Sequence, residues 1–301
     1  MTLPVLPPPQ RVDSMSLAIT PNHRTGIRSG RRAATPAEIQ LAANEAGAEP
    51  RPDMVSALDR GLTLLNCFRD GQVALGASEL SRLTDIPRPT VIRLAATLVA
   101  HRWLQPDADG ERFRLGAGVV SLARSFLAGL DIRAAARAQM QALADATGGA
   151  VYLAVRDGLE MVLIEACRAS ATMLSARLDV GSRVPMAVSA LGRAYLGAID
   201  EGGRNALLAA LQQAAGDAWP AQREALERAL AAQAGRGFAL SAGEFHAEIN
   251  SVSAAITAPT GQVYAFNCGG PAFSFSEARL CREVAPALLA MAARVARDVG
   301  A

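Results

Sequence analysis

Three short helical patterns and one hairpin pattern follow one another closely within residues 54–116. This order constrains the fold more than any other feature of the sequence. The stretch "IPRPTVIRLAATL" opens with two prolines, which a helix tolerates in its first turn because a missing N–H costs no helical hydrogen bond there. The following "WLQPDADGERFRLG" has two strand-like pieces around a turn that contains Pro, Asp and Gly. The sequence therefore predicts a winged helix-turn-helix over residues 53–116.

The helix predicted to begin near Pro87 has one apolar face and one polar face. Val91, Leu94 and Leu98 form the apolar stripe, and no carboxylate occurs between residues 86 and 98. A carboxylate on the polar face would repel a polyanion, whereas arginine attracts phosphates and reads base edges. The sequence predicts contact with double-stranded DNA; for Arg93 taken alone, solvated surface charge is the alternative. The predicted DNA-contacting residues are Arg88, Pro89, Thr90, Arg93 and Thr97 on the helix, with Arg112 and Arg114 on the hairpin.

The charge balance requires any DNA-binding surface to be local, because 30 basic and 28 acidic residues leave a net charge of only +2. The four cysteines include no C-x-x-C pair, so their spacing favours neither a disulfide framework nor a zinc site. No apolar stretch reaches the roughly 18 residues that a membrane span requires. The first residues also lack the pattern of a secretory signal. We expect a soluble, cytoplasmic protein with no membrane partner.

Outside the winged helix, composition and periodicity divide the chain into a tail, a linker and a larger domain. Residues 1–52 are rich in Pro, Arg, Ala and Glu and predict a mobile tail. Helical periodicity then predicts a linker helix over residues 117–130, with a break at Asp131. This helix is a candidate dimer contact, and packing on its own chain is the alternative.

Residues 131–301 have a mixed helix and strand pattern. The runs "AVYLAV" and "EMVLIEAC" flank Asp157-Gly158, a strong hairpin signal, and "TMLSARL" is a candidate third strand. Helices are predicted from Ser189, over 203–215 and 221–235, and from Ser276 toward residue 298 with an interruption at Pro286. Three further strand-like runs lie between residues 237 and 270. The prediction is an α+β fold whose curved antiparallel sheet carries helices on one side.

Enzymatic interpretations find little support in the sequence. It contains neither G-x-S-x-G nor a phosphate-binding G-x-x-x-x-G-K-[ST] loop, and Ser189 is better explained as a helix cap than as a nucleophile. Glu244, His246 and Glu248 are two residues apart; a solvated charged loop is favoured over a weak metal site there. Cys268 is interpreted as a core residue rather than a reactive thiol. We predict no enzyme, no cofactor and no bound metal.

Six motifs in order, over roughly residues 54–298, resemble the IclR family of bacterial transcription regulators. They are "SALDRGLTLLNCF", "LSRLTDIPRPTVIRLAATL", "DGERFRLG", "VGSRVPMAVSALGRAYL", "GFALSAGEFHAEINSVSAAI" and "GGPAFSFSEARL". The resemblance implies a winged helix, a linker helix and an effector-binding domain similar to GAF and PAS domains. It also implies dimers or paired dimers on partly palindromic DNA, regulating catabolic genes in response to a small organic-acid or aromatic metabolite.

The resemblance assigns site residues position by position. Arg88, Thr90 and Arg93 match the family's DNA-contacting pattern, whereas Pro89 replaces a hydroxyl residue. The implied ligand-binding residues are Met173, Ala176, Ser189, Ala190, Leu191, Ser241, Ile249, Ser251, Asn267 and Gly269.

Departures from the family pattern affect the implied pocket. Ala187 and Val188 replace a polar pair, and Ser251 replaces a cysteine. Since the implied lining contains no arginine, we expect a smaller or less polar ligand held chiefly by backbone amides and hydroxyls. The alternative function is a metabolite-binding or catalytic α/β domain whose helix-turn-helix makes protein contacts only.

Overall fold

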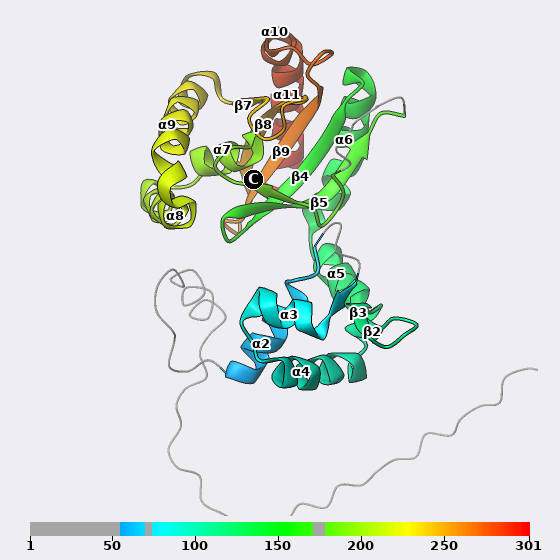
Figure 1. Cartoon of the computed structure of the whole chain (residues 1–301). Coiled ribbons are helices and arrows are strands. Elements are labelled where there is room, and N and C mark those ends of the chain that lie inside the picture. Colours follow the sequence, from blue (N-terminus) through cyan, green and yellow to red (C-terminus); the bar gives the residue numbers. More distant parts are fainter. Residues whose placement is uncertain (1–54, 70–73, 171–177) are drawn as a thin grey trace, which may run out of the picture. The chain divides into compact units, whose positions relative to one another are not determined.

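The computed structural model describes residues 55–69, 74–170 and 178–301 (Figure 1). The chain divides into two units, Met1–Pro50 and Arg51–Ala301, and the described residues belong to the second unit. The predicted tail over residues 1–52 lies outside the described residues, as do the candidate strand residues 172–177 with Met173 and Ala176.

Three helices and a small antiparallel sheet form the winged helix-turn-helix, which confirms the prediction. The helices are α2 (Ser56–Leu65), α3 (Ala77–Thr84) and α4 (Arg88–Ala100). The strands are β1 (Leu75–Gly76), β2 (Leu104–Pro106) and β3 (Arg112–Leu115), in the order β1-β3-β2. Leu64, Leu80 and Val91 are fully buried and join these elements in one core. The two-residue strand β1 was not predicted, because a run this short has no periodicity to detect.

The link between α3 and α4 is tight because of its backbone conformation. Asp85 ends α3 in the left-handed region, with φ of 55°, which aspartate tolerates better than most residues. The Ser81 hydroxyl donates to the Ile86 carbonyl over 2.6 Å, and Ile86 is buried in the core. Pro87 then caps α4 and Pro89 lies in its first turn, as predicted.

Two helices follow the wing, α5 (Gly118–Ala128) and α6 (Asp131–Thr147), so the predicted break falls directly before Asp131. The start of α5 is fixed to the end of the winged helix. Gly116 lies so close to Arg102 that an added Cβ would come within 2.3 Å of the Arg102 carbonyl oxygen, and this contact requires glycine. No residue of α5 is buried, whereas one side of α6 is buried in a core.

The larger domain is built on a six-stranded sheet in the order β6-β5-β4-β9-β8-β7, with every neighbouring pair antiparallel. Its strands are β4 (Ala150–Asp157), β5 (Glu160–Arg168), β6 (Arg183–Pro185), β7 (Ala239–Ala242), β8 (Ile249–Thr257) and β9 (Val263–Pro271). The predicted hairpin at Asp157-Gly158 joins β4 to β5, and Gly158 has a φ of 60°. The predicted antiparallel sheet is therefore confirmed.

Helices cover both faces of this sheet, so the prediction of helices on one side was wrong. The covering helices are α6, α7 (Ala190–Ala198), α8 (Glu201–Ala215), α9 (Trp219–Arg236) and α11 (Ala285–Asp298). Val151 and Leu153 pack into the core with α6 and α11, while Tyr152 and Ala154 pack into the core with α7. In Figure 1 strands β8 and β9 lie between α7 and α11. The sequence did indicate a strand covered on both faces, because "AVYLAV" is an unbroken apolar run rather than an alternating one.

The C-terminal helix is interrupted where Pro286 predicts an interruption. The Ser276 hydroxyl caps α10 (Glu277–Arg279), residues Leu280–Val284 form a π-helical turn, and Pro286 lies in the first turn of α11. Because proline has no N–H to donate, the wider turn that precedes it accommodates the missing hydrogen bond. No helix of the described residues is long and apolar enough to cross a membrane.

Candidate DNA-contacting helix and ligand cavity

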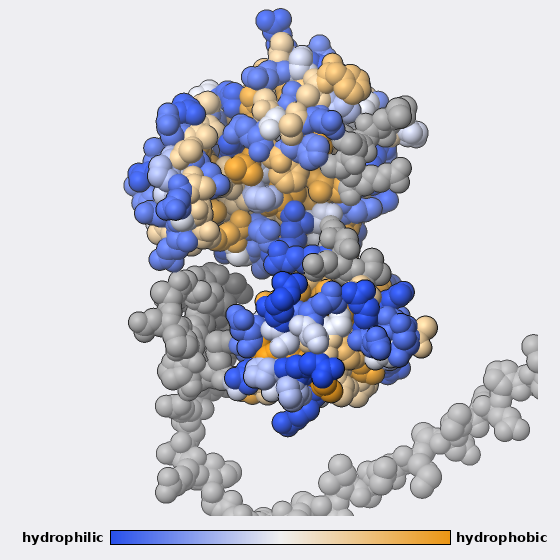
Figure 2. All heavy atoms as spheres, in the orientation of Figure 1, coloured by the Kyte–Doolittle hydropathy of each residue, from blue (hydrophilic) through white to orange (hydrophobic). Residues whose placement is uncertain are grey.

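The exposed face of α4 carries positive charge and no negative charge, and the apolar Ile92 is also 43% exposed there. Arg88, Pro89, Arg93 and Thr97 are exposed, and Thr90 is half-buried. Val91 and Ala95, on the opposite face, are fully buried. Figure 2 shows hydrophilic residues interspersed with apolar ones on the surface where Figure 1 places α4. The helix thus presents the predicted polar stripe to solvent and its apolar stripe to the core.

The arginines of this face have no acidic partner. Within residues 55–69, 74–170 and 178–301, no carboxylate forms an ion pair with Arg88, Arg93 or Arg114. The first turn of α4 also contains no acidic residue, so the partial positive charge of the helix N-terminus is not neutralised there. Both features favour an anionic partner for this surface.

Arg112 differs from Arg114 although both lie on the exposed strand β3. The Arg112 guanidinium pairs with the Glu79 carboxylate over 2.7 Å, and the same carboxylate accepts the Gly76 N–H over 2.8 Å. These two contacts, the backbone hydrogen bond first, lower the pKa of Glu79. Of the two predicted wing contacts, Arg114 therefore has its charge available to a phosphate, while Arg112 is shared with Glu79.

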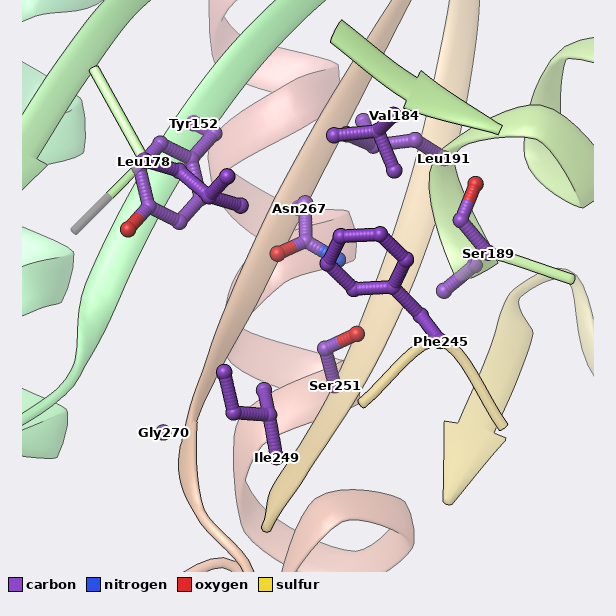
Figure 3. Close-up of a pocket in the computed structure, with 12 residues that line it drawn as sticks. Tyr152, Leu178, Val184, Ser189, Leu191, Phe245, Ile249, Ser251, Asn267 and Gly270 are labelled. Carbon is purple, nitrogen blue, oxygen red and sulfur yellow. The ribbon is translucent and has the colours of Figure 1, made fainter. Parts of the chain in front are cut away.

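A small cavity with an open mouth lies on the α7 side of the large sheet (Figure 3). Predicted ligand-binding residues that line it are Ser189, Ala190, Leu191, Ile249, Ser251, Asn267 and Gly269. Ser241 is buried but does not line the cavity, because its hydroxyl faces the Val188 carbonyl and donates to it over 3.2 Å. Lining residues that were not predicted are Tyr152, Leu178, Val184, Phe245 and Gly270.

Strand register explains Tyr152, and adjacency in the chain explains Gly270. Tyr152 is paired with Asn267 across β4 and β9, so both side chains lie on the same face. Gly270 follows Gly269 at the end of β9. Phe245 had a weaker signal: it is the one aromatic residue in the charged segment "GEFHAE", and an aromatic side chain is out of place in a purely solvated loop.

The polar groups of the cavity differ in their availability. The Ser189 hydroxyl donates to the Pro185 carbonyl over 2.6 Å and accepts the Gly192 N–H over 3.1 Å, so it is occupied as the cap of α7. The Asn267 amide nitrogen donates to the Val252 carbonyl and to the Ser253 hydroxyl, which leaves its oxygen as an acceptor. The Ser251 hydroxyl has no hydrogen bond within the described chain. Figure 3 shows Ser251 and Asn267 beside the Phe245 ring.

The N-terminus of α7 adds two donors. Ala190 and Leu191 line the cavity, and their backbone N–H groups have no acceptor among the described residues. Such groups at a helix N-terminus favour an anion. None of the described lining residues is charged. The arrangement combines apolar walls with a small set of hydrogen-bonding groups, which is typical of small-molecule sites.

Arg168 lies just outside the lining. Its guanidinium carbon is 6.0 Å from the centre of the Tyr152 ring, and the guanidinium also donates to the Leu178 carbonyl. Asp179 lies 3.8 Å from the same guanidinium. Burial raises the pKa of the Tyr152 phenol, and Arg168 opposes only part of that rise, so the phenol stays neutral near pH 7.

The segment of Glu244, His246 and Glu248 does not form the metal site considered as an alternative. Glu244 binds Arg193 through both carboxylate oxygens, and the His246 ring nitrogen accepts the Glu248 N–H over 3.4 Å. Within the described ranges no group of three potential metal ligands occurs. Cys268 is fully buried, and desolvation raises the pKa of its thiol to about 11. It is a core cysteine, as interpreted.

Comparisons with known proteins match both domains of the described chain. Residues 57–108 match the IclR helix-turn-helix domain, and residues 124–299 match the bacterial transcriptional regulator IclR C-terminal family. The chain is 32% identical to the HTH-type transcriptional regulator TsaQ1/TsaQ2 of Comamonas testosteroni, over 79% of this chain and 86% of that protein.

Solved structures share the fold. An IclR family transcriptional regulator from Brucella abortus is 36% identical, with a TM-score of 0.76, over 85% of this chain and 97% of its own. An IclR homolog from Microbacterium hydrocarbonoxydans, complexed with 4-hydroxybenzoate, is 23% identical, with a TM-score of 0.65, over 81% and 99%. The proteins that match over most of this chain are named as regulators rather than as enzymes. The chain belongs to the IclR family and is a helix-turn-helix transcription regulator.

Proposed function

We propose that this regulator binds operator DNA through α4 and that a small carboxylic acid with an aromatic or apolar body, bound in the cavity, changes its affinity for DNA. The observation that carries the ligand class is the distribution of groups in the cavity. Hydrogen-bond donors gather at the α7 N-terminus and Ser251, while apolar side chains form the remaining walls.

The carboxylate of such a ligand fits the donor end of the cavity. The Ala190 and Leu191 N–H groups and the Ser251 hydroxyl offer donors, and the positive end of the α7 dipole favours a negative charge. No carboxylate of the described lining opposes that charge. The apolar body would lie against Tyr152 and Phe245, whose rings favour a flat ligand.

The proposed DNA contacts are those that the sequence predicts, except that we expect Arg114 to contribute more than Arg112. Arg88 and Arg93 would contact phosphates and base edges with Thr90 and Thr97 beside them, since a helix of this type enters the major groove. Arg114 would contact the neighbouring phosphates from the wing, and Arg112 less so because Glu79 already binds it.

A homodimer through α5 would bring two such helices together on one operator. Leu122 and Phe126, which are four residues apart and share one face, are exposed by 52% and 53% on a helix without any buried residue. A second copy of the same face would cover these side chains, and two-fold symmetry matches a partly palindromic site. The bound acid would then favour one spacing of the paired helices over another, which shifts a population between two states.

Paired ligands test the ligand class directly. We use 4-hydroxybenzoate and 4-hydroxybenzyl alcohol, which differ in the carboxylate, and measure binding by calorimetry and by the shift in Tm. The expected result is binding of the acid with a clear preference over the alcohol, and a smaller preference in Ser251→Ala, where the two α7 N–H groups remain. Equal binding of the two compounds, or binding of neither, would contradict the proposed ligand class.

A further inference from the structure

We propose that the ion pair between Arg193 and Glu244 is a latch that holds Phe245 over the ligand cavity and so controls access to it. The inference rests on the proposed function of the cavity as a ligand site and adds the residues that regulate it. Phe245 lies in the β7–β8 loop between Gly243 and Glu248, directly after the carboxylate that Arg193 binds.

Arg193 is an unusual residue for its position. It lies on α7, its side chain is only 2% exposed, and it is the largest fully buried side chain of the described residues. Its guanidinium donates to both oxygens of Glu244, at 2.7 Å for the first, and to the Leu240 carbonyl over 3.0 Å. The Nε–H of the same guanidinium donates to the Ala187 carbonyl over 3.4 Å. Glu244 is the one carboxylate that pairs with it in the described chain.

These partners lie on different elements next to the cavity, and none of them lines it. Ala187 precedes the Ser189–Leu191 wall, Leu240 lies on β7, and Glu244 holds the loop that carries Phe245. Figure 3 shows the Phe245 ring reaching from that loop toward Ser189 and Asn267. One buried guanidinium therefore fixes the α7 wall and the Phe245 loop at the same time.

The charges explain why this contact acts as a latch rather than as passive packing. A buried guanidinium that loses its carboxylate is left as an uncompensated charge, so the ion pair strongly favours the closed loop. The carboxylate itself is 40% exposed. The loop is also held by backbone bonds on either side of Phe245: Gly243 donates to the Ile249 carbonyl, Ile249 to the His246 carbonyl and Ala272 to the Glu248 carbonyl, while no described residue forms a backbone hydrogen bond with Phe245 itself. Rupture of one ion pair can thus release Phe245 without unfolding the sheet.

Limited proteolysis tests the latch without any ligand. Chymotrypsin cleaves after phenylalanine, and mass spectrometry separates cleavage after Phe245 from cleavage after Phe273, which is 89% exposed and serves as an internal control. In Glu244→Gln the cleavage after Phe245 is expected to be about tenfold faster, with cleavage after Phe273 unchanged. Arg193→Lys, which keeps the charge but cannot bridge both oxygens, is expected to act in the same direction.

Glu201→Gln is the matched control, because it removes one exposed carboxylate from the first turn of α8, and no described residue pairs with Glu201. It is expected to leave both cleavage rates unchanged. Cleavage after Phe245 at the same rate in wild type, Glu244→Gln and Arg193→Lys would overturn the latch.

Binding of 4-hydroxybenzoate then tests whether the latch acts on the cavity. Glu244→Gln and Phe245→Ala are each expected to weaken binding about tenfold, and the double variant is expected to bind no more weakly than Phe245→Ala alone. Additive losses, or faster cleavage with unchanged affinity, would overturn control of the cavity by Phe245. Should 4-hydroxybenzoate fail to bind wild type, the proposed ligand class fails, while the proteolysis still decides whether the latch exists.

Discussion

Arginine plays opposite parts in the two halves of this regulator. In the winged helix, Arg88 and Arg93 project from α4 with no carboxylate partner among the described residues. In the larger domain, Arg193 is buried and Arg133 largely so, and each is bound to a glutamate. An exposed, unpaired guanidinium is available to a polyanion, whereas a buried and paired one fixes the fold. The surroundings, rather than the residue type, decide which part an arginine plays.

Loss of the buried carboxylate Glu165 should produce the largest effect. Its side chain is 3% exposed on β5 and binds Arg133 at 2.9 Å and Arg137 at 2.5 Å, both from α6. Glu165→Ala leaves two guanidinium groups without their partner, and we expect a loss of about 3 kcal/mol in the free energy of unfolding. Urea denaturation measures it.

The control for Glu165 is an exposed ion pair. Glu227 binds Arg223 one turn away on α9, and both side chains are more than half exposed. Glu227→Ala should change the free energy of unfolding by about 0.5 kcal/mol or less. Equal losses for Glu165→Ala and Glu227→Ala would break the distinction between buried and exposed charges.

Placing a charge on the apolar face of α5 should shift the oligomeric state. Phe126 is 53% exposed, so Phe126→Asp costs the isolated subunit little, but the charge would be buried in a dimer that pairs two α5 faces. Sedimentation velocity is expected to show a smaller species than wild type with unchanged circular dichroism. An unchanged sedimentation coefficient would place any dimer contact elsewhere.

The two wing arginines allow a paired and an unpaired arginine to be compared within one strand, β3. Arg114→Ala should weaken duplex binding by about 1 kcal/mol and reduce its salt dependence, since a free guanidinium is lost. Arg112→Ala should weaken it less, because Arg112 is already shared with Glu79. Fluorescence anisotropy with labelled duplex DNA measures the loss of affinity in each variant. A larger loss in Arg112→Ala than in Arg114→Ala would show that the ion pair with Glu79 does not reduce the contribution of Arg112 to DNA binding.

The smallest effect concerns thiols, which follow the same rule of burial. The pKa of Cys268 is raised to about 11 by desolvation, so at pH 8 the thiol stays protonated and should not react with a disulfide reagent in the folded protein. The thiolate would appear only as the pH rises toward 11. Cys67 and Cys281, which are both half-buried, should react before the buried Cys167 and Cys268. Reaction of Cys268 at pH 8 in the folded protein would contradict its burial.

Local patterns made most of the fold predictable. The two prolines located the start of α4, Asp157-Gly158 located the β4–β5 turn, and Pro286 located the interruption of the last helix. Each is a local backbone constraint, which a single sequence displays directly. The placement of helices on both faces was missed, because an unbroken apolar run such as "AVYLAV" was not interpreted as a strand buried on both sides.

The sites were predictable where a helix or a strand fixes the side chain. Ser251 and Asn267 lie on the predicted strands and line the cavity, although their role toward a ligand stays a prediction. Phe245 and the bond between Glu244 and Arg193 depend on a loop that meets a helix about 50 residues away in sequence, and no local pattern reports such a contact. For the same reason, the segment of Glu244 was interpreted as a solvated charged loop, and its bond to the buried Arg193 was not predicted.

The salt dependence of duplex binding tests the central assignment most directly. Arg93→Ala and Arg228→Ala each remove one exposed arginine, the first from α4 and the second from α9, so their net charges are identical. We predict that wild-type affinity for duplex DNA falls steeply with salt, that Arg93→Ala weakens binding about tenfold with a smaller slope, and that Arg228→Ala matches wild type. Binding that is absent, insensitive to salt, or equally weakened in both variants would contradict the role assigned to α4.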